Sequence, residues 1–303
     1  MRKKWIRTAT PYLFILPWII GLVVFTLGPL VFSFVMSLCN WSLTREPYFV
    51  GLGNYIEMFT KDKQFIKSLG ISLKYAAIFV PLNMAIALFL AMLIAQPVKG
   101  TKIFRTIFYI PSVISGVAVS IIWSWILNSD YGILNYLLSL LGIQGPKWLV
   151  DPAYAILAVI IASAFGVGAM MLIFYTDIKG ISSSLYEAAS LDGASSARQF
   201  FSVTLPLITP TLLFNLITSI ISSFQQVTLV MLLTGGGPLK STYFYGLYTY
   251  NNAFKHHKLG YASANAWVMF VIILIMTILV FKSSSSWVFY QSETSKYKRK
   301  RGN

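Results

Sequence analysis

The chain has 303 residues, of which 56% are hydrophobic and 11% are charged, and its formal net charge is +15. Soluble domains carry about 25% charged residues, so a soluble globular fold is excluded because the polar residues are too few to cover its surface. A membrane removes that requirement, since lipid surrounds the apolar outer face. The composition therefore indicates an integral membrane protein.

Six apolar segments are each long enough to cross a bilayer, which takes about 20 residues in a helix. Their apolar runs are continuous, which favours helices over a β-barrel, whose strands alternate with a period of two. The sequence thus predicts an all-α, polytopic protein with a single transmembrane domain over residues 1–303. The expected spans cover about residues 11–38, 75–97, 106–128, 153–176, 206–233 and 260–281.

Basic residues gather at both ends of the chain, at Arg2, Lys3, Lys4 and Arg7 and again over residues 296–301. Six spans place both ends on one side, together with most of the Lys and Arg residues, and the positive-inside rule assigns that side to the cytoplasm. We interpret the basic tails as anchors on anionic lipid rather than as nucleic-acid-binding arms. The apolar part of the first span is too long for a signal peptide, so we expect it to be uncleaved.

Two connections between the expected spans have features of their own. The uncharged stretch 131–146 is too short for a span, and we interpret it as an external or re-entrant segment. Between the fourth and fifth spans, Ser184 and Glu187 have the spacing of a capping box, so a short helix is expected through Ala189. Gly193 should end this helix at a bend, before a second short helix at about residues 195–203.

The sequence contains no constellation for catalysis or metal binding. Cys39 is the only cysteine, and His256 and His257 are adjacent, so their side chains point apart on a helix. The segment Gly235–Ser241 comes close to a phosphate-binding loop, but Leu239 stands where that loop requires glycine. We therefore expect no catalytic residue, no metal and no cofactor bound by this chain. No ionisable residue lies deep in an expected span, which disfavours an ion-coupled transporter.

Neutral polar side chains mark the fifth span. Asn215, Ser219, Ser222 and Gln226 recur at helical spacing and form one polar stripe. Contact with lipid would be costly, so the stripe faces either a cavity on a substrate pathway or a partner helix, and both interpretations stay open. Amides, hydroxyls and aromatic rings suit a sugar. The predicted substrate pathway consists of Asn215, Ser219, Ser222, Ser223, Gln225, Gln226 and, from other spans, Asn83 and Trp123.

The segment Leu185–Pro210 reads Leu185-Tyr186-Glu187-Ala188-Ala189-Ser190-Leu191-Asp192-Gly193-Ala194 and continues with Gln199-Phe200 and Thr204-Leu205-Pro206. It resembles the EAA loop of ABC importer permeases, and more narrowly that of the carbohydrate-uptake subfamily. Further motifs that are similar to this subfamily occur in the same order along the chain, at Gly51–Tyr55, Phe104-Arg105, Tyr109–Pro111, Thr234–Pro238 and Gly260–Ala264.

This resemblance implies a permease subunit of an ATP-driven importer for a sugar or an oligosaccharide, forming half of the translocation pathway in a bacterial or archaeal cytoplasmic membrane. The implied partners are a second, non-identical permease, two ATP-binding subunits and an extracytoplasmic solute-binding protein, with no nucleic acid. ATP and Mg²⁺ would be bound by the partner ATPase, so the chain itself is expected not to be an enzyme. The implied ATPase-docking residues are Tyr186, Glu187, Ala188, Ala189, Asp192 and Gly193.

Two alternatives stay open beside this interpretation. One is an ion-coupled secondary transporter that works without an ATPase. The other is an importer permease of the same class for a non-sugar solute, such as a glycerol phosphodiester, for which a strongly basic cavity would be expected. The expected spans contain no cluster of basic residues.

Overall fold

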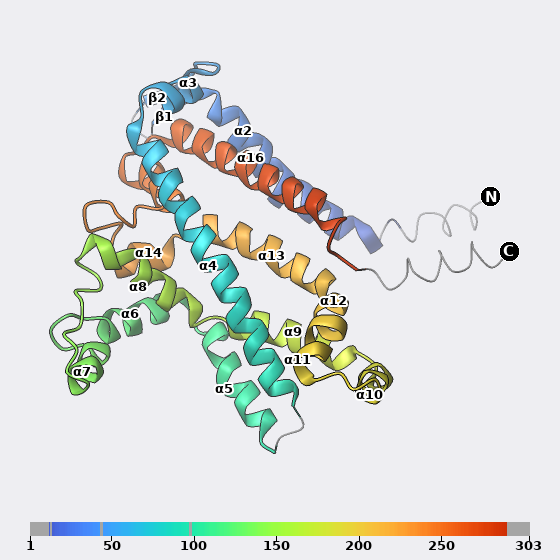
Figure 1. Ribbon diagram of the computed structural model, residues 1–303. Helices are drawn as coiled ribbons and strands as arrows, with labels where there is room; N and C mark the ends of the chain where they lie inside the picture. Colours follow the sequence, from blue (N-terminus) through green and yellow to red (C-terminus); the bar gives the residue numbers. More distant parts are fainter. Residues whose placement is uncertain (1–11, 13, 43–44, 97–98, 290–303) are drawn as a thin grey trace, which may run out of the picture. The chain divides into compact units, whose positions relative to one another are not determined.

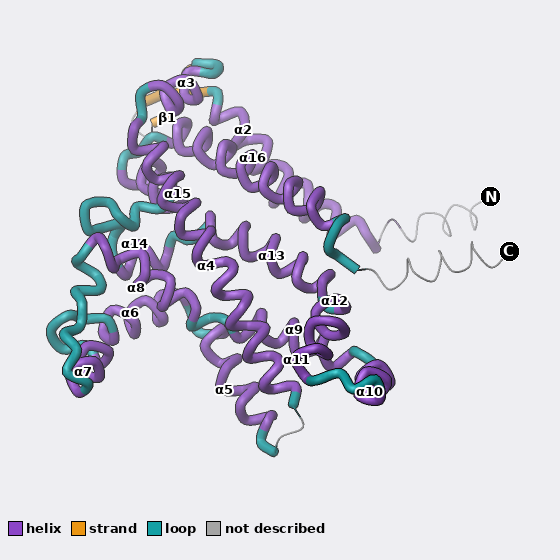
Figure 2. Tube along the Cα trace, viewed as in Figure 1, coloured by secondary structure: helices purple, strands orange, loops and turns teal. Residues whose placement is uncertain are grey.

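A computed structural model describes residues 12, 14–42, 45–96 and 99–289, and these residues are mostly helical (Figures 1 and 2). The predicted basic tails lie outside the described residues. The chain divides into two compact units, Met1–Ile66 with Tyr248–Val271 and Lys67–Leu247 with Ile272–Asn303.

The first unit combines apolar helices with a small hairpin. Its elements are the helix Phe14–Ser37, which contains η1 (Val23–Leu27) and α2 (Gly28–Ser37), then β1 (Cys39–Ser42), β2 (Arg45–Phe49), α3 (Gly53–Thr60), η3 (Asn251–Lys255) and the beginning of α16 (Leu259–Ser284). The two strands pair antiparallel, with Cys39 opposite Phe49. The buried Asn54 donates from Nδ2 to the carbonyl oxygens of Ser37 (2.8 Å) and Cys39 (3.0 Å). The motif Gly51–Tyr55 therefore secures the end of α2, where carbonyl groups lose their helical partners.

Asp62 joins three segments of the first unit. Its Oδ1 accepts hydrogen bonds from the backbone N–H groups of Gln64 (2.8 Å) and Phe65 (3.1 Å), which caps the start of α4 (Lys63–Ala95). Its Oδ2 accepts from the hydroxyls of Tyr248 (2.5 Å) and Tyr261 (2.9 Å). Burial opposes ionisation of this carboxyl, but the four hydrogen bonds outweigh burial and lower the pKa of Asp62 below its usual range.

We expect Asp62→Asn to destabilise the protein by about 1–3 kcal/mol at neutral pH, because hydrogen bonds to a charged acceptor are lost. A lowered pKa means that the carboxylate contributes stability above its unfolded-state pKa of about 3.9, and this contribution disappears as the pH falls through the folded-state value. The difference in melting temperature between wild type and variant should therefore shrink in acid. The exposed Asp130 provides the control Asp130→Asn. An equal difference in melting temperature at neutral and acidic pH would contradict the stabilising role of the ionised Asp62 carboxylate.

The second unit holds most of α4 and the helices between residues 101 and 247 (Figure 1). Its elements are α5 (Thr101–Val113), α6 (Gly116–Ile126), α7 (Ile133–Leu140), α8 (Pro152–Ala164), α9 (Gly168–Gly180), α10 (Ser183–Leu191), α11 (Ser196–Gln199), η2 (Phe200–Thr204), α12 (Leu205–Leu207), α13 (Thr209–Phe224), α14 (Thr228–Leu233) and the first residues of α15 (Tyr245–Tyr250). Buried apolar residues of α4, α8 and α14 share one core cluster, which includes Tyr75, Phe79, Val159, Ile160, Val230 and Leu233.

Three described helices are long and apolar enough to cross a membrane, namely Phe14–Ser37, Lys63–Ala95 and Leu259–Ser284. They correspond to the expected first, second and sixth spans. The second begins at Lys63 rather than near residue 75, because the Asp62 cap extends the helix beyond its apolar part. The other three expected spans are helix pairs bent by 102° (α5 and α6), 51° (α8 and α9) and 67° (residues 196–207 and α13), so the count reaches six if each pair is one span.

Two of these bends coincide with local features that length and hydropathy do not report. Pro111 lies near the end of α5, and Ser115 starts α6 by accepting a hydrogen bond from the N–H of Ala118 (3.3 Å). Gly166 lies in the break between α8 and α9. The expected fifth span also ends early, because α13 stops at Phe224 and three non-helical residues separate it from α14.

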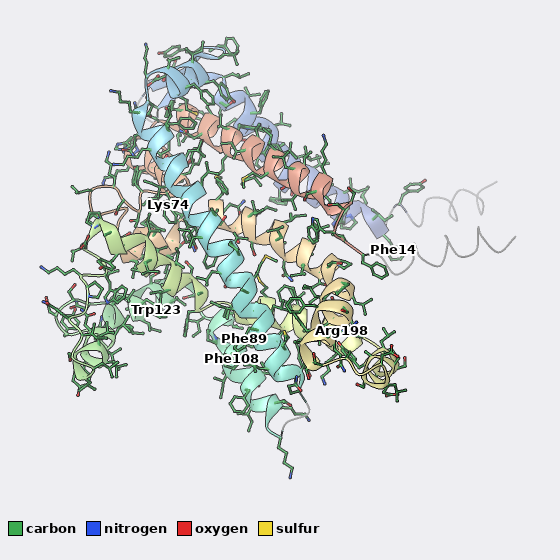
Figure 3. All side chains as sticks on the ribbon, viewed as in Figure 1. Phe14, Lys74, Phe89, Phe108, Trp123 and Arg198 are labelled. Carbon is green, nitrogen blue, oxygen red and sulfur yellow. The ribbon has the colours of Figure 1, made fainter. Side chains whose placement is uncertain are left out.

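Gly168 allows α9 to approach α5 closely. A Cβ added at this position would overlap the backbone carbonyl group of Phe108, a residue labelled in Figure 3, whereas one added at Gly166 would meet only ordinary contacts. We expect Gly168→Ala to lower the stability of the protein by about 1–3 kcal/mol through overpacking. Gly166→Ala is the matched control and should cost much less in melting temperature. Equal effects of the two substitutions would show that the approach at Gly168 is unimportant.

Candidate functional site

The second unit contains a neutral cavity of about 440 Å³ between α4, the α8–α9 pair and α13. None of the described residues that line it carries a charge at neutral pH. Its polar lining comes mainly from the fifth expected span, and its aromatic lining comes from α4. The lining residues are Tyr75, Phe79, Asn83, Ser163, Gly166, Ala169, Met170, Ile173, Asn215, Thr218, Ser219, Ser222, Ser223 and Gln226.

Two buried side-chain amides line this cavity from different helices. Asn83 on α4 is 8% exposed and Asn215 on α13 is 2% exposed. The Oδ1 atom of Asn83 and the Nδ2 atom of Asn215 are buried without a hydrogen-bond partner. One unmet acceptor and one unmet donor therefore lie in the lining of the same cavity.

Three cavity-lining hydroxyl groups of α13 bond to their own helix. Thr218 donates to the carbonyl oxygen of Phe214 (3.0 Å), and Ser223 donates to that of Ile220 (2.7 Å). Ser222 likewise donates to the carbonyl oxygen of Ser219 (3.1 Å). Such bonds leave the oxygen lone pairs available to accept. All four residues of the polar stripe line the cavity, and Gln226 also interacts with the Tyr75 side chain of α4, so both interpretations of the stripe stay open.

Six of the eight predicted pathway residues line this cavity, and two do not. Gln225 is exposed at the C-terminal end of α13 and is absent from the lining. Trp123 lies on α6, as Figure 3 shows, with its ring 5.8 Å from that of Phe165 in an edge-on arrangement. It packs on the apolar core instead. The six that gather are Asn83, Asn215, Ser219, Ser222, Ser223 and Gln226.

The sequence interpretation missed the aromatic wall of the cavity. Tyr75 and Phe79 stack with their ring centroids 5.0 Å apart and their planes inclined by 10°. The Tyr75 hydroxyl donates to the hydroxyl oxygen of Ser163 (2.9 Å). Tyr75, Phe79 and Asn83 are spaced by four residues, which places them on one face of α4. This periodicity was the available signal.

The EAA segment folds as two short helices joined by a glycine turn. α10 ends at Leu191, and Gly193 has a φ of +74°, in the left-handed region that glycine adopts without strain. The N–H of Ala194 donates to the carbonyl oxygen of Ala189 (2.9 Å), which closes the turn. The predicted bend at Gly193 and the second helix near residue 195 are both present.

The predicted capping box is not formed. α10 begins at Ser183 with Ser182 as its N-cap residue, and no side chain caps it. Ser184 lies inside the helix, and its hydroxyl is hydrogen-bonded to that of Ser182 (2.8 Å) rather than to the N–H of Glu187. The helix starts earlier than expected because Ser182 already has extended backbone angles.

The predicted docking residues divide between two faces of α10. The Tyr186 hydroxyl is hydrogen-bonded to Thr204 Oγ1 (2.9 Å), and Ala189 is half-buried, so these two residues face their own chain. Gln199 adds a bond from Nε2 to the Ser190 hydroxyl (2.9 Å) and ties α10 to α11. The exposed members of the predicted set are Glu187, Ala188, Asp192 and Gly193.

Leu191 is an exposed apolar residue of this segment that the sequence interpretation did not select. Its side chain is 90% exposed at the end of α10. With Leu185 and Ala188 it forms a series at steps of three residues on the exposed side of the helix. That spacing could have identified it.

The comparisons with known proteins agree along nearly the whole chain. The family model described as "Binding-protein-dependent transport system inner membrane component" matches residues 83–289. The probable ABC transporter permease protein YesP of Bacillus subtilis (strain 168) is 43% identical over 286 residues, which cover 93% of this chain and 92% of that protein. The trehalose/maltose transport system permease protein MalF of Thermococcus litoralis is 32% identical over 283 residues, which cover 93% and 95%.

The fold also has a counterpart of known structure. A chain of the crystal structure of a bacterial alginate ABC transporter, in complex with an alginate pentasaccharide-bound periplasmic protein, superposes with a TM-score of 0.82. The match covers 93% of this chain and 96% of that one at 22% sequence identity, so the likeness is one of fold. The chain is therefore a membrane permease subunit of an ABC transporter, not an enzyme, and belongs to the family of binding-protein-dependent transport system inner membrane components.

Proposed function

We propose that this chain is one permease subunit of an ATP-driven importer for a sugar or an oligosaccharide, and that the neutral cavity is part of its translocation pathway. The unmet amide atoms of Asn83 and Asn215 carry this proposal. A buried polar group without a partner costs about 1–3 kcal/mol, so such atoms are expected where a solute or water supplies the missing bonds. Sugar hydroxyls both donate and accept hydrogen bonds, so a sugar offers a donor for the oxygen and an acceptor for the N–H group.

The walls of the cavity support a neutral, hydroxylated solute. The stacked rings of Tyr75 and Phe79 provide an apolar surface beside the amides, which suits the alternating apolar and polar faces of a sugar ring. The relative MalF is named for trehalose and maltose transport, and the structural neighbour is named for alginate. Both names concern carbohydrates.

A phosphorylated solute is a poorer fit. Phosphate recognition relies on Arg or Lys side chains that donate charge-assisted hydrogen bonds, and no such residue is among the described residues that line the cavity. An ion-coupled transporter is also not favoured, because the family is one of ABC transporter permeases. The glycerol phosphodiester and ion-coupled alternatives therefore fall behind the sugar importer.

We propose that α10 transmits force from a separate ATP-binding subunit. Its exposed side offers the carboxylate of Glu187, the small side chain of Ala188 and the apolar Leu191. An apolar side chain that is 90% exposed is a candidate anchor for a partner's pocket. The bonds from Tyr186 to Thr204 and from Gln199 to Ser190 tie the two short helices to each other and to η2, which supports a segment that moves as one piece.

The proposed assembly has two different permeases, two ATP-binding subunits that hold ATP and Mg²⁺, and an extracytoplasmic solute-binding protein. The chain would lie in a bacterial or archaeal cytoplasmic membrane with both termini and α10 on the cytoplasmic side. Six spans, counting each bent pair once, would give this topology.

Reconstitution of the assembly in liposomes tests the proposal. The chain would be co-purified with its co-encoded permease, ATPase and binding protein, and uptake of radiolabelled oligosaccharides would be measured with and without ATP. We expect ATP-dependent uptake and sugar-stimulated ATP hydrolysis. Uptake by this chain alone under an ion gradient would contradict the proposal, as would ATP hydrolysis that responds to a phosphodiester and to no sugar.

A further inference from the structure

α7, between α6 and α8 in the second unit, carries an apolar stripe that no described residue covers. The stripe repeats at steps of three and four residues, which places its members on one side of the helix. Its side chains are between 51% and 75% exposed. The members are Ile133, Tyr136, Leu137, Leu140 and Leu141.

The outward direction of this stripe is set by contacts on the opposite side of α7. Leu134 and Leu138 pack against the core cluster that contains the buried residues Leu127 and Trp148. The Nε1 atom of Trp148 donates to Asn135 Oδ1 (2.7 Å). The Nδ2 atom of Asn135 donates in turn to the carbonyl oxygens of Ser129 and Pro146 (both 3.2 Å), which closes the segment around the helix.

The charge pattern matches a segment that lies in the membrane interface. No residue from Tyr131 to Pro146 is charged, and the charges return at both ends with the exposed Asp130 and Lys147. A soluble partner that binds and leaves would expose this stripe to water each time, at a cost of about 25 cal/mol per Å² of apolar surface. A lipid surface would cover the stripe permanently.

The stripe also continues the exposed apolar side of the neighbouring helix. Ile121, Ile122 and Trp125 of α6 are 56%, 43% and 69% exposed. Trp125 lies at the end of α6 that leads into α7, and Tyr131 and Tyr136 follow it. Trp and Tyr gather where a membrane meets water, because their rings are apolar with one polar atom.

A hollow of about 620 Å³ adjoins the stripe, because Ile133 and Tyr136 belong to both. Its rim has a carboxylate, Asp130, and an ammonium group, Lys147, with Gln144 as a neutral polar partner. This combination complements a zwitterionic headgroup, in which an ammonium group and a phosphate lie a few bonds apart.

We propose that α7 is an interfacial helix that binds phospholipid, with Leu137, Leu140 and Leu141 against the acyl chains and the Asp130–Lys147 rim at the level of the headgroups. This inference rests on the membrane location of the family and not on the solute. The helix anchors the connection between α6 and α8 in one leaflet.

Spin labels on the full chain in phosphatidylethanolamine–phosphatidylglycerol nanodiscs test this proposal. Cys39→Ser removes the only cysteine, and single cysteines are then placed by Leu137→Cys, Leu140→Cys and the control Ser139→Cys, an exposed polar position of α7 that lines the hollow. We expect relaxation by oxygen to exceed relaxation by a water-soluble nickel chelate at 137 and 140, and the reverse at 139. Greater nickel accessibility at 137 and 140 would overturn the proposal, and so would low accessibility to both reagents, which indicates coverage by protein.

A second measurement on the unmodified chain guards against misfolded variants. A phospholipid with a photoactivatable group in its acyl chain is incorporated in the nanodisc and cross-linked, and the modified peptides are mapped by mass spectrometry. We expect adducts within residues 133–141 at yields comparable with those on α16. Adducts on α16 together with none on α7 would overturn the proposal.

Discussion

Gly193→Val is expected to reduce solute uptake by about tenfold or more while the protein still inserts into the membrane. The φ of +74° at Gly193 lies in the left-handed region, where a side chain costs about 1–2 kcal/mol and where a β-branched residue is a genuine outlier. A cost of about 1.4 kcal/mol is a tenfold change in an equilibrium. The turn would then adopt another geometry and displace α10 from the docking position.

The control for this variant is Gly193→Asn, because asparagine tolerates the left-handed region better than other residues. Open space surrounds Gly193, since an added Cβ would meet nothing within 4 Å, so the two variants differ in backbone preference rather than in steric clash. Uptake and sugar-stimulated ATP hydrolysis should fall with Val and largely persist with Asn. Full activity of the Val variant, with normal assembly, would contradict a coupling role for this turn.

The double variant Asn83→Leu/Asn215→Leu is expected to lower uptake by about 10- to 100-fold without lowering stability. Each lost hydrogen bond to a neutral solute is worth about 0.5–1.5 kcal/mol. In the empty protein, however, the substitution removes two buried amide atoms that have no partner, so the melting temperature should stay equal or rise. Transport and stability thus move in different directions, which a purely structural role for the amides does not predict.

Gln225→Leu is the matched control for the double variant. Gln225 is an exposed amide residue at the C-terminal end of α13, the helix that carries Asn215, and its side chain does not line the cavity. Solute uptake by the Gln225→Leu variant should remain near that of the wild type. The measurement is initial uptake at several sugar concentrations, together with thermal unfolding of the same preparations. A double variant that unfolds at lower temperature and still transports normally would show that the amides stabilise the fold and do not bind the solute.

The residues of the candidate cavity illustrate what a linear pattern can predict. Asn215, Ser219 and Ser222 share a face of one helix, and that relation depends only on the helical repeat. Whether this face meets a cavity or a neighbouring helix depends on the distance between helices, which no local pattern contains. Asn83 joins the site from α4, far away in the sequence, and only folding brings its unmet oxygen to the same cavity.

The EAA segment shows the same division between what the sequence predicts and what the fold decides. Small side chains and Gly193 predicted a bent pair of short helices, and the pair is present. The sequence did not show which residues of α10 remain available to a partner. The hydrogen bond between the Tyr186 hydroxyl and Thr204 fixes which side of α10 packs on its own chain. Leu191 remains exposed because no described residue packs against the other side of α10 at its C-terminal end.

Composition and hydropathy were sufficient to establish that this protein lies in a membrane, because the free energy of transfer to lipid is a sum over residues and needs no contacts. The order of its motifs was sufficient to indicate the family. The bends of 102°, 51° and 67°, the presence of Asn83 and Asn215 in the lining of one cavity, and the division of α10 into an inner and an outer face required the tertiary structure. Each of these features depends on contacts between residues distant in sequence, or on how packing accommodates a local break in a helix. Such effects are not sums over single residues, so the sequence alone does not give them.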